Sequence, residues 1–439
     1  MALRSFILIL IMTIGGLVPC RVARATVKPP PGHVADYGWA STRGGRGGHI
    51  IRVTNLKADG PGSFAAAVAA EGPRIVVFEV AGVVDLDRAI IPITKPCLTV
   101  AGQTAPSPGV TFVRGGITIQ THDVIIQHIR VRPGEAGAAK KSGWEVDAIA
   151  TSGGAHDVIV DHCSVSWATD ENLSASGPRF DGSNLDQWRT NTSHSITFSN
   201  CLIAEGLNNS THSKGGHSKG SLVHDNATGI AIIGNLYASN VRRNPFFKGG
   251  AMGLIANNYI YNPGSAAIHY NLSASEWTGH PYAVGQMVIV GNVMKRGPNT
   301  KEGMPLFHFA GSGLLVIFME DNLIFDHRGK LENPPLLLAS TGLPKQCKAL
   351  KVRPSRPEGI DLRPADEVEA YVLENAGARP WDRDETDRRI VRQLREGTNR
   401  VIDSEKDVGG YPKIRQKSRA FEPSQWDLDS MTRYESTSR

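Results

Sequence analysis

The sequence predicts an all-β protein: a single-stranded, right-handed parallel β-helix, or solenoid, with a helical and irregular C-terminal tail. Three observations favour this fold class. Between residues 50 and 330, short β-rich runs are broken by Gly, Asn and Ser, and helical periodicity is nearly absent. A short pattern recurs through the same region. Hairpin signals are too few for the antiparallel blades of a propeller.

The recurring pattern is two or three β-formers, one or two polar residues, then Asn or His followed by an apolar residue or Cys. Its Asn/His positions are His128, His162, Asn200, Asn235, Asn258, Asn292 and Asn322. They are 34, 38, 35, 23, 34 and 30 residues apart, which is typical of coils carrying different loops. Asn tolerates the left-handed conformation of a turn, and stacked amides can hydrogen-bond along a column. We therefore interpret these residues as scaffold.

Both ends of the predicted solenoid, residues 26–342, need covers, because open coils expose strand edges and apolar interior. A short helix within residues 56–70 could cover the first coil. After residue 343 the composition becomes polar and charged, with helical spacing over 365–376 and 382–396. We expect residues 343–439 to pack on the solenoid as helices and loops.

The first 25 residues have the features of a secretory signal peptide. Arg4 supplies a positive start, residues 6–18 form an apolar run, and residues 23–25 read Ala-Arg-Ala, an A-x-A cleavage site. The sequence therefore predicts a secreted or periplasmic protein. An alternative is a lipid anchor at Cys20, which would attach the chain to a membrane, although Pro19 precedes it where a small residue is expected.

The net charge of the chain does not indicate a nucleic-acid partner. Removing residues 1–25 removes three arginines and no acid, so Lys+Arg falls from 48 to 45 against 42 Asp+Glu. The net charge then falls from +6 to about +3, and no basic run with interleaved aromatics occurs. We expect a monomer that does not bind nucleic acid.

Two cysteines test the coil register. Cys163 and Cys201 follow the Asn/His position in successive copies of the pattern. We expect them to stack in adjacent coils, about 4.8 Å apart, as free and buried thiols. The same column is expected to contain Ile129, Leu236, Tyr259, Val293 and Leu323.

Four motifs in order resemble the signatures of the pectate lyase superfamily. They are Asp-Ala-Ile at 147–149, Ile-Val-Asp-His-Cys-Ser at 159–164, His-Ser-Lys at 217–219 and Arg-Asn-Pro-Phe-Phe-Lys at 243–248. The resemblance covers about residues 45–330. It implies a lyase that cleaves polygalacturonate or a related uronate polymer by calcium-assisted β-elimination, with the acidic polysaccharide as its partner.

The chemistry needs a cation, because the proton removed lies on carbon beside a carboxylate and is very weakly acidic. Period-two spacing places Glu145 and Asp147 on one side of a strand, and Asp170 follows one coil later. The resemblance assigns these three acids to Ca²⁺. A fourth family acid is replaced by Ser174, a gap that Glu171 or substrate oxygens could fill. We expect carboxylate oxygens of Asp147 and Asp170 about 5 Å apart or less.

The resemblance also assigns the basic residues. Arg243 matches the arginine thought to take the proton, and Lys248 replaces a second arginine. Lys219 matches a lysine that binds the substrate carboxylate. Lys214 is a rival to it, since the segment 212–219 repeats itself, and His217 joins the substrate-binding set.

Other interpretations stay open. The chain could be a non-catalytic carbohydrate-binding or adhesion β-helix, or a glycoside hydrolase on the same fold, although the carboxylate motifs of such hydrolases are missing from the sequence. His212 and His217 could bind a transition metal, which their spacing on a predicted loop disfavours. Asp161 and His162 resemble an acid–base pair, but their place in the repeat favours buried scaffold hydrogen bonding.

Overall fold

The computed structural model describes residues 37–338, 343–354, 357 and 359–434. These residues belong to one unit, His33–Arg439. The predicted signal peptide at 1–25, with Cys20, lies outside the described residues. None of the helices within the described ranges is long and apolar enough to cross a membrane.

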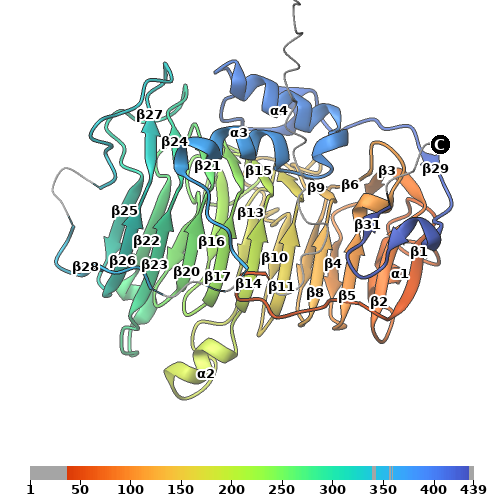
Figure 1. The fold of residues 1–439 in the computed structure, drawn as a ribbon, viewed down its shortest axis with the longest axis horizontal. Coiled ribbons are helices and arrows are strands. Elements are labelled where there is room, and N and C mark those ends of the chain that lie inside the picture. Colours follow the sequence, from red (N-terminus) through yellow and green to blue (C-terminus); the bar gives the residue numbers. More distant parts are fainter. Residues whose placement is uncertain (1–36, 339–342, 355–356, 358, 435–439) are drawn as a thin grey trace, which may run out of the picture. The chain divides into compact units, whose positions relative to one another are not determined.

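Three sheets of stacked strands form a parallel β-helix, which confirms the predicted fold class (Figure 1). Within the described ranges, the largest sheet contains β1 (His49–Val53), β2 (Arg74–Phe78), β5 (Leu98–Ala101), β8 (Val124–Gln127), β11 (His156–Asp161), β14 (His194–Ser199), β17 (Thr228–Ile233), β20 (Met252–Ala256), β23 (Gly285–Val290), β26 (Leu315–Glu320) and β28 (Cys347–Ala349). Strand β28 lies beyond the boundary at residue 342 expected from composition.

Each coil adds one strand to each of two further sheets. The eight-stranded sheet of the described chain contains β4 (Ile90–Ile93), β7 (Gly116–Ile119), β10 (Ile149–Thr151), β13 (Glu171–Ala175), β16 (Lys219–Val223), β19 (Phe246–Lys248), β22 (Ile268–Leu272) and β25 (Phe307–Gly311). The ten-stranded sheet, over the same residues, contains β3 (Val80–Asp85), β6 (Val110–Val113), β9 (Arg130–Arg132), β12 (Ser164–Ser166), β15 (Leu202–Ala204), β18 (Leu236–Ala238), β21 (Tyr259–Tyr261), β24 (Val293–Lys295), β27 (Leu323–Phe325) and β29 (Lys417–Ser418).

The interior is filled by columns of aliphatic and aromatic side chains. On the largest sheet, one buried column runs through Ile126, Val160, Phe198, Ile232, Ile255 and Ile289. Residues in register on parallel strands are about 4.8 Å apart, so like side chains stack in contact from coil to coil. This packing explains why the strands read as short apolar runs.

The turn between the largest and ten-stranded sheets uses two adjacent columns. The first holds left-handed residues with φ between +48° and +67°: His128, His162, Asn200, Gly234, Asn257, Gly291 and Asp321. The second continues from Ile129, Cys163 and Cys201 into Asn235, Asn258, Asn292 and Asn322. In this second column the side-chain amide of Asn235, Asn258 and Asn292 donates to the side-chain oxygen of the asparagine in the next coil, at 2.9–3.1 Å.

The predicted alignment of the repeat was therefore wrong by one residue in its second half. Cys163 and Cys201 are in register, free and buried, as expected. However, Cys201 is followed in its column by Asn235, whose side-chain oxygen accepts a hydrogen bond from the Cys201 amide at 2.8 Å. Leu236, Tyr259, Val293 and Leu323 instead continue from Leu202. Asn suits the first column because it tolerates the left-handed conformation, and the second because its amide can hydrogen-bond along the column. The sequence pattern therefore treated the two columns as one.

Helix α1 (Phe64–Ala69) covers the first coil. Its start is capped by Ser63, whose side chain accepts a hydrogen bond from the amide of Ala66 at 3.1 Å. Phe64 is buried, with its ring centroid 4.7 Å from that of Phe112 inside the solenoid. A second short helix, α2 (Leu185–Thr190), projects away from the coils (Figure 1).

The C-terminal segment runs back along the solenoid (Figure 1). Helix α3 (Ala365–Asn375) packs on β21 and β24, and α4 (Glu385–Arg395) follows. Two buried arginines of β9 anchor α4: Arg132 binds Asp384 at 2.6 Å and Asp387 at 2.7 Å, while Arg130 binds Asp387 at 3.1 Å. The chain then adds β29 antiparallel to β3 and ends in the hairpin of β30 (Trp426–Asp427) and β31 (Thr432–Arg433).

Candidate functional site

Four of the predicted site residues lie at the same edge of neighbouring coils. Asp147, Glu171, Lys219 and Arg243 stand at the starts of β10, β13, β16 and β19, consecutive strands of the eight-stranded sheet. Each lies three residues before a position on one register line, which passes through Ala150, Ser174, Leu222 and Phe246. The coil register thus gathers residues that are almost 100 positions apart in the sequence.

Three carboxylates converge at this edge. Oxygens of Asp147, Asp170 and Glu171 lie within 4.8 Å of one another, which meets the expected closeness of Asp147 and Asp170. Asp147 accepts hydrogen bonds from the Glu171 amide at 2.9 Å and from the hydroxyl of Ser174. An all-oxygen set of this kind suits a hard cation such as Ca²⁺.

Burial and mutual repulsion give the two aspartates different acidities. Burial, with the neighbouring charge of Asp170, raises the pKa of Asp147 above its ordinary value. Burial also opposes ionisation of Asp170, but the hydrogen bond and charge of His217, together with Arg243, outweigh it and lower the pKa of Asp170. The pKa of Asp170 therefore lies below that of Asp147.

Glu145 is not part of this carboxylate cluster. Its Oε1 accepts hydrogen bonds from the amide of Ser213 at 2.9 Å and from the Ser213 hydroxyl. The same oxygen lies 3.3 Å from Nδ1 of His212. The prediction that Glu145 joins Asp147 as a metal ligand, made from their period-two spacing, was wrong. The Glu145 side chain instead hydrogen-bonds to the loop around residue 213.

Arg243 lies beside the carboxylates. Its backbone is left-handed, with φ of +64°, because one extra residue falls between the Lys219–Arg242 bridge and the Leu222–Phe246 pair. The guanidinium forms an ion pair with Glu171 and lies 5.3 Å from the ring centroid of Phe246. Burial lowers the pKa of Arg243, although Asp170 and Asp147 oppose that shift.

Lys219 and Lys214 face the same groove. Lys219 is buried, and Lys214 lies in an exposed loop. Burial, followed by the charge of Arg242, lowers the pKa of Lys219 to about 8. Lys219 can therefore change its charge near neutral pH.

Lys248 also lines the groove but is held by two acids that the sequence did not indicate. Its ammonium lies 3.1 Å from Asp225 and 2.6 Å from Glu276. Trp277 donates to Asp225 at 2.7 Å, which fixes that carboxylate. Lys248 thus has two carboxylate partners within the protein, unlike Lys219, to which no carboxylate is paired among the described ion pairs.

His217 lines the groove beside Asp170. Its Nε2 lies 2.7 Å from Oδ1 of Asp170, so the ring orients that carboxylate. Asp161 and His162 are buried away from the groove, where Asp161 binds His162 at 2.7 Å and Ser199 at 2.8 Å. Their predicted scaffold role agrees with these contacts.

The groove has a volume of about 430 Å³. The register line that contains Phe246 continues into His269 and His308, which sequence reasoning missed. The His269 ring stacks on Phe246 with centroids 4.2 Å apart. Only the strand register reveals that these residues line the groove, since no local motif marks them.

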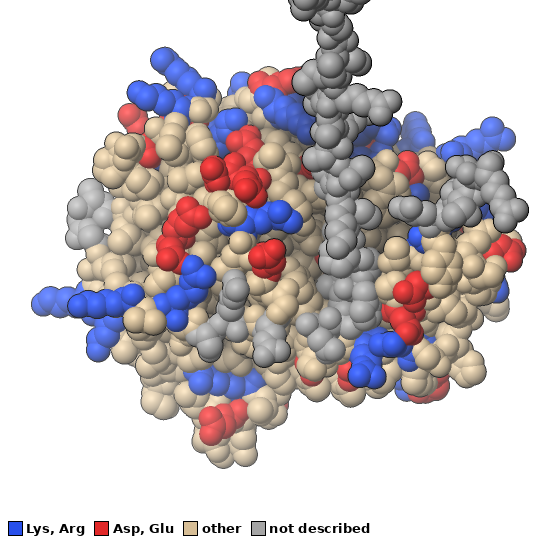
Figure 2. All heavy atoms as spheres, viewed as in Figure 1, with Lys and Arg blue, Asp and Glu red and all other residues tan. Residues whose placement is uncertain are grey.

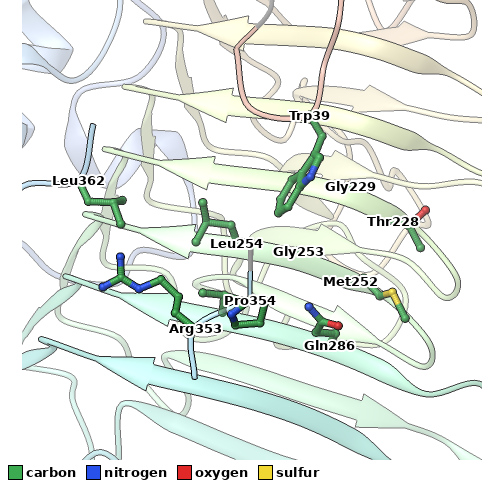
Figure 3. A pocket seen from close by; sticks show the side chains of 11 residues that line it. Trp39, Thr228, Gly229, Met252, Gly253, Leu254, Gln286, Arg353, Pro354 and Leu362 are labelled. Atoms are coloured by element: carbon green, nitrogen blue, oxygen red, sulfur yellow. The ribbon is translucent and has the colours of Figure 1, made fainter. Parts of the chain in front are cut away.

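A second pocket, of about 360 Å³, lies over the largest sheet (Figure 3). Trp39 and Leu362 pack there against the apolar cluster that contains Leu254. Arg353, at its rim, is paired with Glu320. No carboxylate lines this pocket in the described chain, so the chemistry-bearing groups belong to the groove. On the face in Figure 2, outside the grey atoms, basic and acidic side chains are interspersed.

The stacked sheets define a parallel β-helix with a groove of mixed charge. The chain is 32% identical over 408 residues to a probable pectate lyase C of Emericella nidulans, covering 91% of this chain and 83% of the relative. It is also 32% identical over 381 residues to a probable pectate lyase C of Neosartorya fischeri, covering 85% and 79%. The chain therefore belongs to the pectate lyase family.

Solved structures share the fold. A pectate lyase from Bacillus sp. N165 in complex with trigalacturonate aligns with a TM-score of 0.51 at 14% identity, covering 78% of this chain and 98% of that one. The major allergen from cedar pollen aligns with a TM-score of 0.52 at 14% identity, covering 78% and 92%. No family model matches the chain.

Proposed function

We propose that the chain cleaves polygalacturonate, or a related uronate polymer, by calcium-assisted β-elimination. The observation that carries this proposal is a cluster of three carboxylates, two of which, Asp170 and Glu171, line one groove with Lys219 and Arg243. An acidic polymer needs cationic groups to bind it and a base to remove its carbon-bound proton.

The donor set fits Ca²⁺. Asp147, Asp170 and Glu171 offer only oxygen atoms, and Ser174 supports Asp147 at the position where the resemblance leads us to expect another acid. Bound there, the cation would neutralise the substrate carboxylate and stabilise negative charge that develops beside it.

Arg243 is proposed to receive the proton. Burial lowers the pKa of Arg243, a shift in the direction that a base requires, and its backbone is left-handed where the extra residue precedes β19. The electron pair of the broken carbon–hydrogen bond forms the carbon–carbon double bond. The glycosidic carbon–oxygen bond then breaks, and its oxygen leaves with a proton from water.

The three lysines of the groove are proposed to have different roles in binding the substrate. Lys219 is proposed to bind a substrate carboxylate as a point charge, with Lys214 reaching the same groove from its loop. Lys248 is proposed to act at the far side of the groove, where Asp225 and Glu276 hold its position. His217 supports the reaction through Asp170.

Export is proposed from residues 1–25, with attachment through Cys20 as the alternative. A polymer too large to enter a cell requires an extracytoplasmic enzyme. Mass spectrometry of the protein recovered from its producing cells distinguishes a cleaved chain from a lipidated one.

Ultraviolet absorbance tests the reaction, because only elimination produces a conjugated unsaturated uronate. We expect absorbance to rise on polygalacturonate with calcium and to stop when a chelator is added. Reducing ends that increase without absorbance would indicate hydrolysis and overturn the proposal. Binding without cleavage would favour the carbohydrate-binding alternative.

A further inference from the structure

Two histidines next to the carboxylate cluster form a stacked pair that the proposed reaction uses only in part, through His217. His212 and His217 lie in the loop between β15 and β16, and both side chains are buried. Their rings stack with centroids 3.5 Å apart and planes at 19°. The pair brings imidazole nitrogens beside one carboxylate, and because a ligated metal lies in the plane of the ring, binding one ion requires the two rings to rotate out of this stack.

The nitrogens converge on Asp170. Nε2 of His217 lies 2.7 Å from Oδ1 of Asp170, and Nε2 of His212 lies 3.9 Å from the same oxygen. One ligand atom from each of the three residues falls within 4.8 Å of the others. We propose that Asp170, His212 and His217 form a second cation site, selective for a borderline divalent metal such as Zn²⁺ or Co²⁺.

The ligand chemistry separates this site from the calcium site. Imidazole nitrogens suit zinc and cobalt, whereas calcium takes oxygen ligands. Two imidazoles and one carboxylate are the protein ligands of several zinc sites, which leave a further position for water. Asp147 and Glu171 belong to the carboxylate cluster and not to the histidine group, and Asp170 is common to both.

Glu145 supplies a second, independent observation. A histidine that binds a metal through Nε2 commonly donates Nδ1–H to a carboxylate. Oε1 of Glu145 lies 3.3 Å from Nδ1 of His212 and is itself fixed by the amide of Ser213. Without metal, the backbone amide of Lys214 donates to Nδ1 of His212 at 3.1 Å. Metal binding would replace this hydrogen bond with one from Nδ1–H of His212 to Glu145.

This second site goes beyond the proposed function but shares Asp170 with it. A metal held by the two histidines draws on a carboxylate that the calcium site also needs. The borderline metal therefore competes with calcium, and its occupancy raises the calcium concentration required for activity.

Cobalt titration of the full chain, followed by visible absorption without substrate, tests the site. We expect one tightly bound Co²⁺ per chain, with affinity at least tenfold weaker in His212→Gln and His217→Gln. His156→Gln is the matched control, because His156 stacks between His122 and His194 away from Asp170. Equal cobalt affinity in His212→Gln and the unaltered chain would overturn the proposal.

Two further measurements keep the test decisive. If the histidine variants fail to fold, X-ray absorption at the cobalt edge of the unaltered chain replaces them: two imidazole scatterers support the site, and oxygen ligands alone overturn it. Asp147→Ala separates the two sites, since it should weaken calcium dependence and leave cobalt binding within about threefold. A failure of lyase activity would leave the cobalt result unaffected.

Discussion

Replacing Arg243 with lysine removes a guanidinium while it keeps the positive charge. Arg243 spans two coils to reach Glu171 and also lies over the Phe246 ring. A lysine ammonium can keep one of its ionic contacts, but it loses the second donor of the planar fork. The substitution also replaces the proposed base with a shorter side chain.

The expected loss follows from these contacts. One hydrogen bond to a charged group contributes about 1.5–3 kcal/mol, which corresponds to roughly 10- to 150-fold in rate. Displacing a proton-transfer group costs about 10²–10⁴-fold. We therefore expect Arg243→Lys to lower kcat by about 10² or more, with a much smaller change in KM.

The assay is the initial rate of ultraviolet absorbance on polygalacturonate at saturating calcium. Arg395→Lys is the control, because Arg395 is exposed on α4 and does not line the groove, and this variant should stay within about threefold of the unaltered chain. Turnover of Arg243→Lys near that of the unaltered chain would refute the proposed role of Arg243.

Three further predictions concern calcium, pH and stability. Asp147→Ala should raise the calcium concentration for half-maximal activity at least tenfold, since it removes a hard anionic ligand; an unchanged calcium titration would exclude Asp147 from the site. Lys219, with a pKa of about 8, falls from about nine-tenths charged at pH 7 to about one-tenth at pH 9, so kcat/KM at saturating calcium should fall about tenfold over that range. Lys219→Arg should flatten this fall, and an identical pH profile would contradict the assignment. Asp387→Ala strips buried Arg130 and Arg132 of a partner and should destabilise the chain by about 3–5 kcal/mol in denaturant unfolding, against little change for the exposed Arg388→Ala. Unfolding at the same denaturant concentration would show that the anchor of α4 contributes nothing.

The sequence predicted the architecture because a solenoid repeats its chemistry. Apolar strand residues and turn residues recur at each coil, so the fold class and the caps could be inferred without knowing how coils align. The alignment of one coil with the next was harder to predict from the sequence. Gly234-Asn235 and Asn200-Cys201 place asparagine in adjacent columns, and either column accepts it. A pattern based on residue type alone therefore shifted the later coils by one residue.

The site shows the same limit. Asp147, Asp170, Lys219 and Arg243 were found from motifs in the chain. The register brings Asp170, Lys219 and Arg243 into one groove, with Asp147 beside Asp170. The contact of Ser174 with Asp147 depends on the neighbouring coil, so no local motif reveals it. Similarly, Glu145 hydrogen-bonds to a distant loop, and Lys248 pairs with Glu276, which follows β22. No local motif reveals either contact.

Register also explains why the groove needs long basic side chains. Neighbouring parallel strands are about 4.8 Å apart, so the two strand steps from Glu171 to Arg243 span about 10 Å between backbones. Glutamate and arginine together bridge that distance, while a shorter pair leaves the charges apart. The extra residue that makes Arg243 left-handed turns its side chain toward the carboxylates instead of along the strand. The geometry of the proposed site therefore depends on both the spacing of the coils and a single local departure from their register.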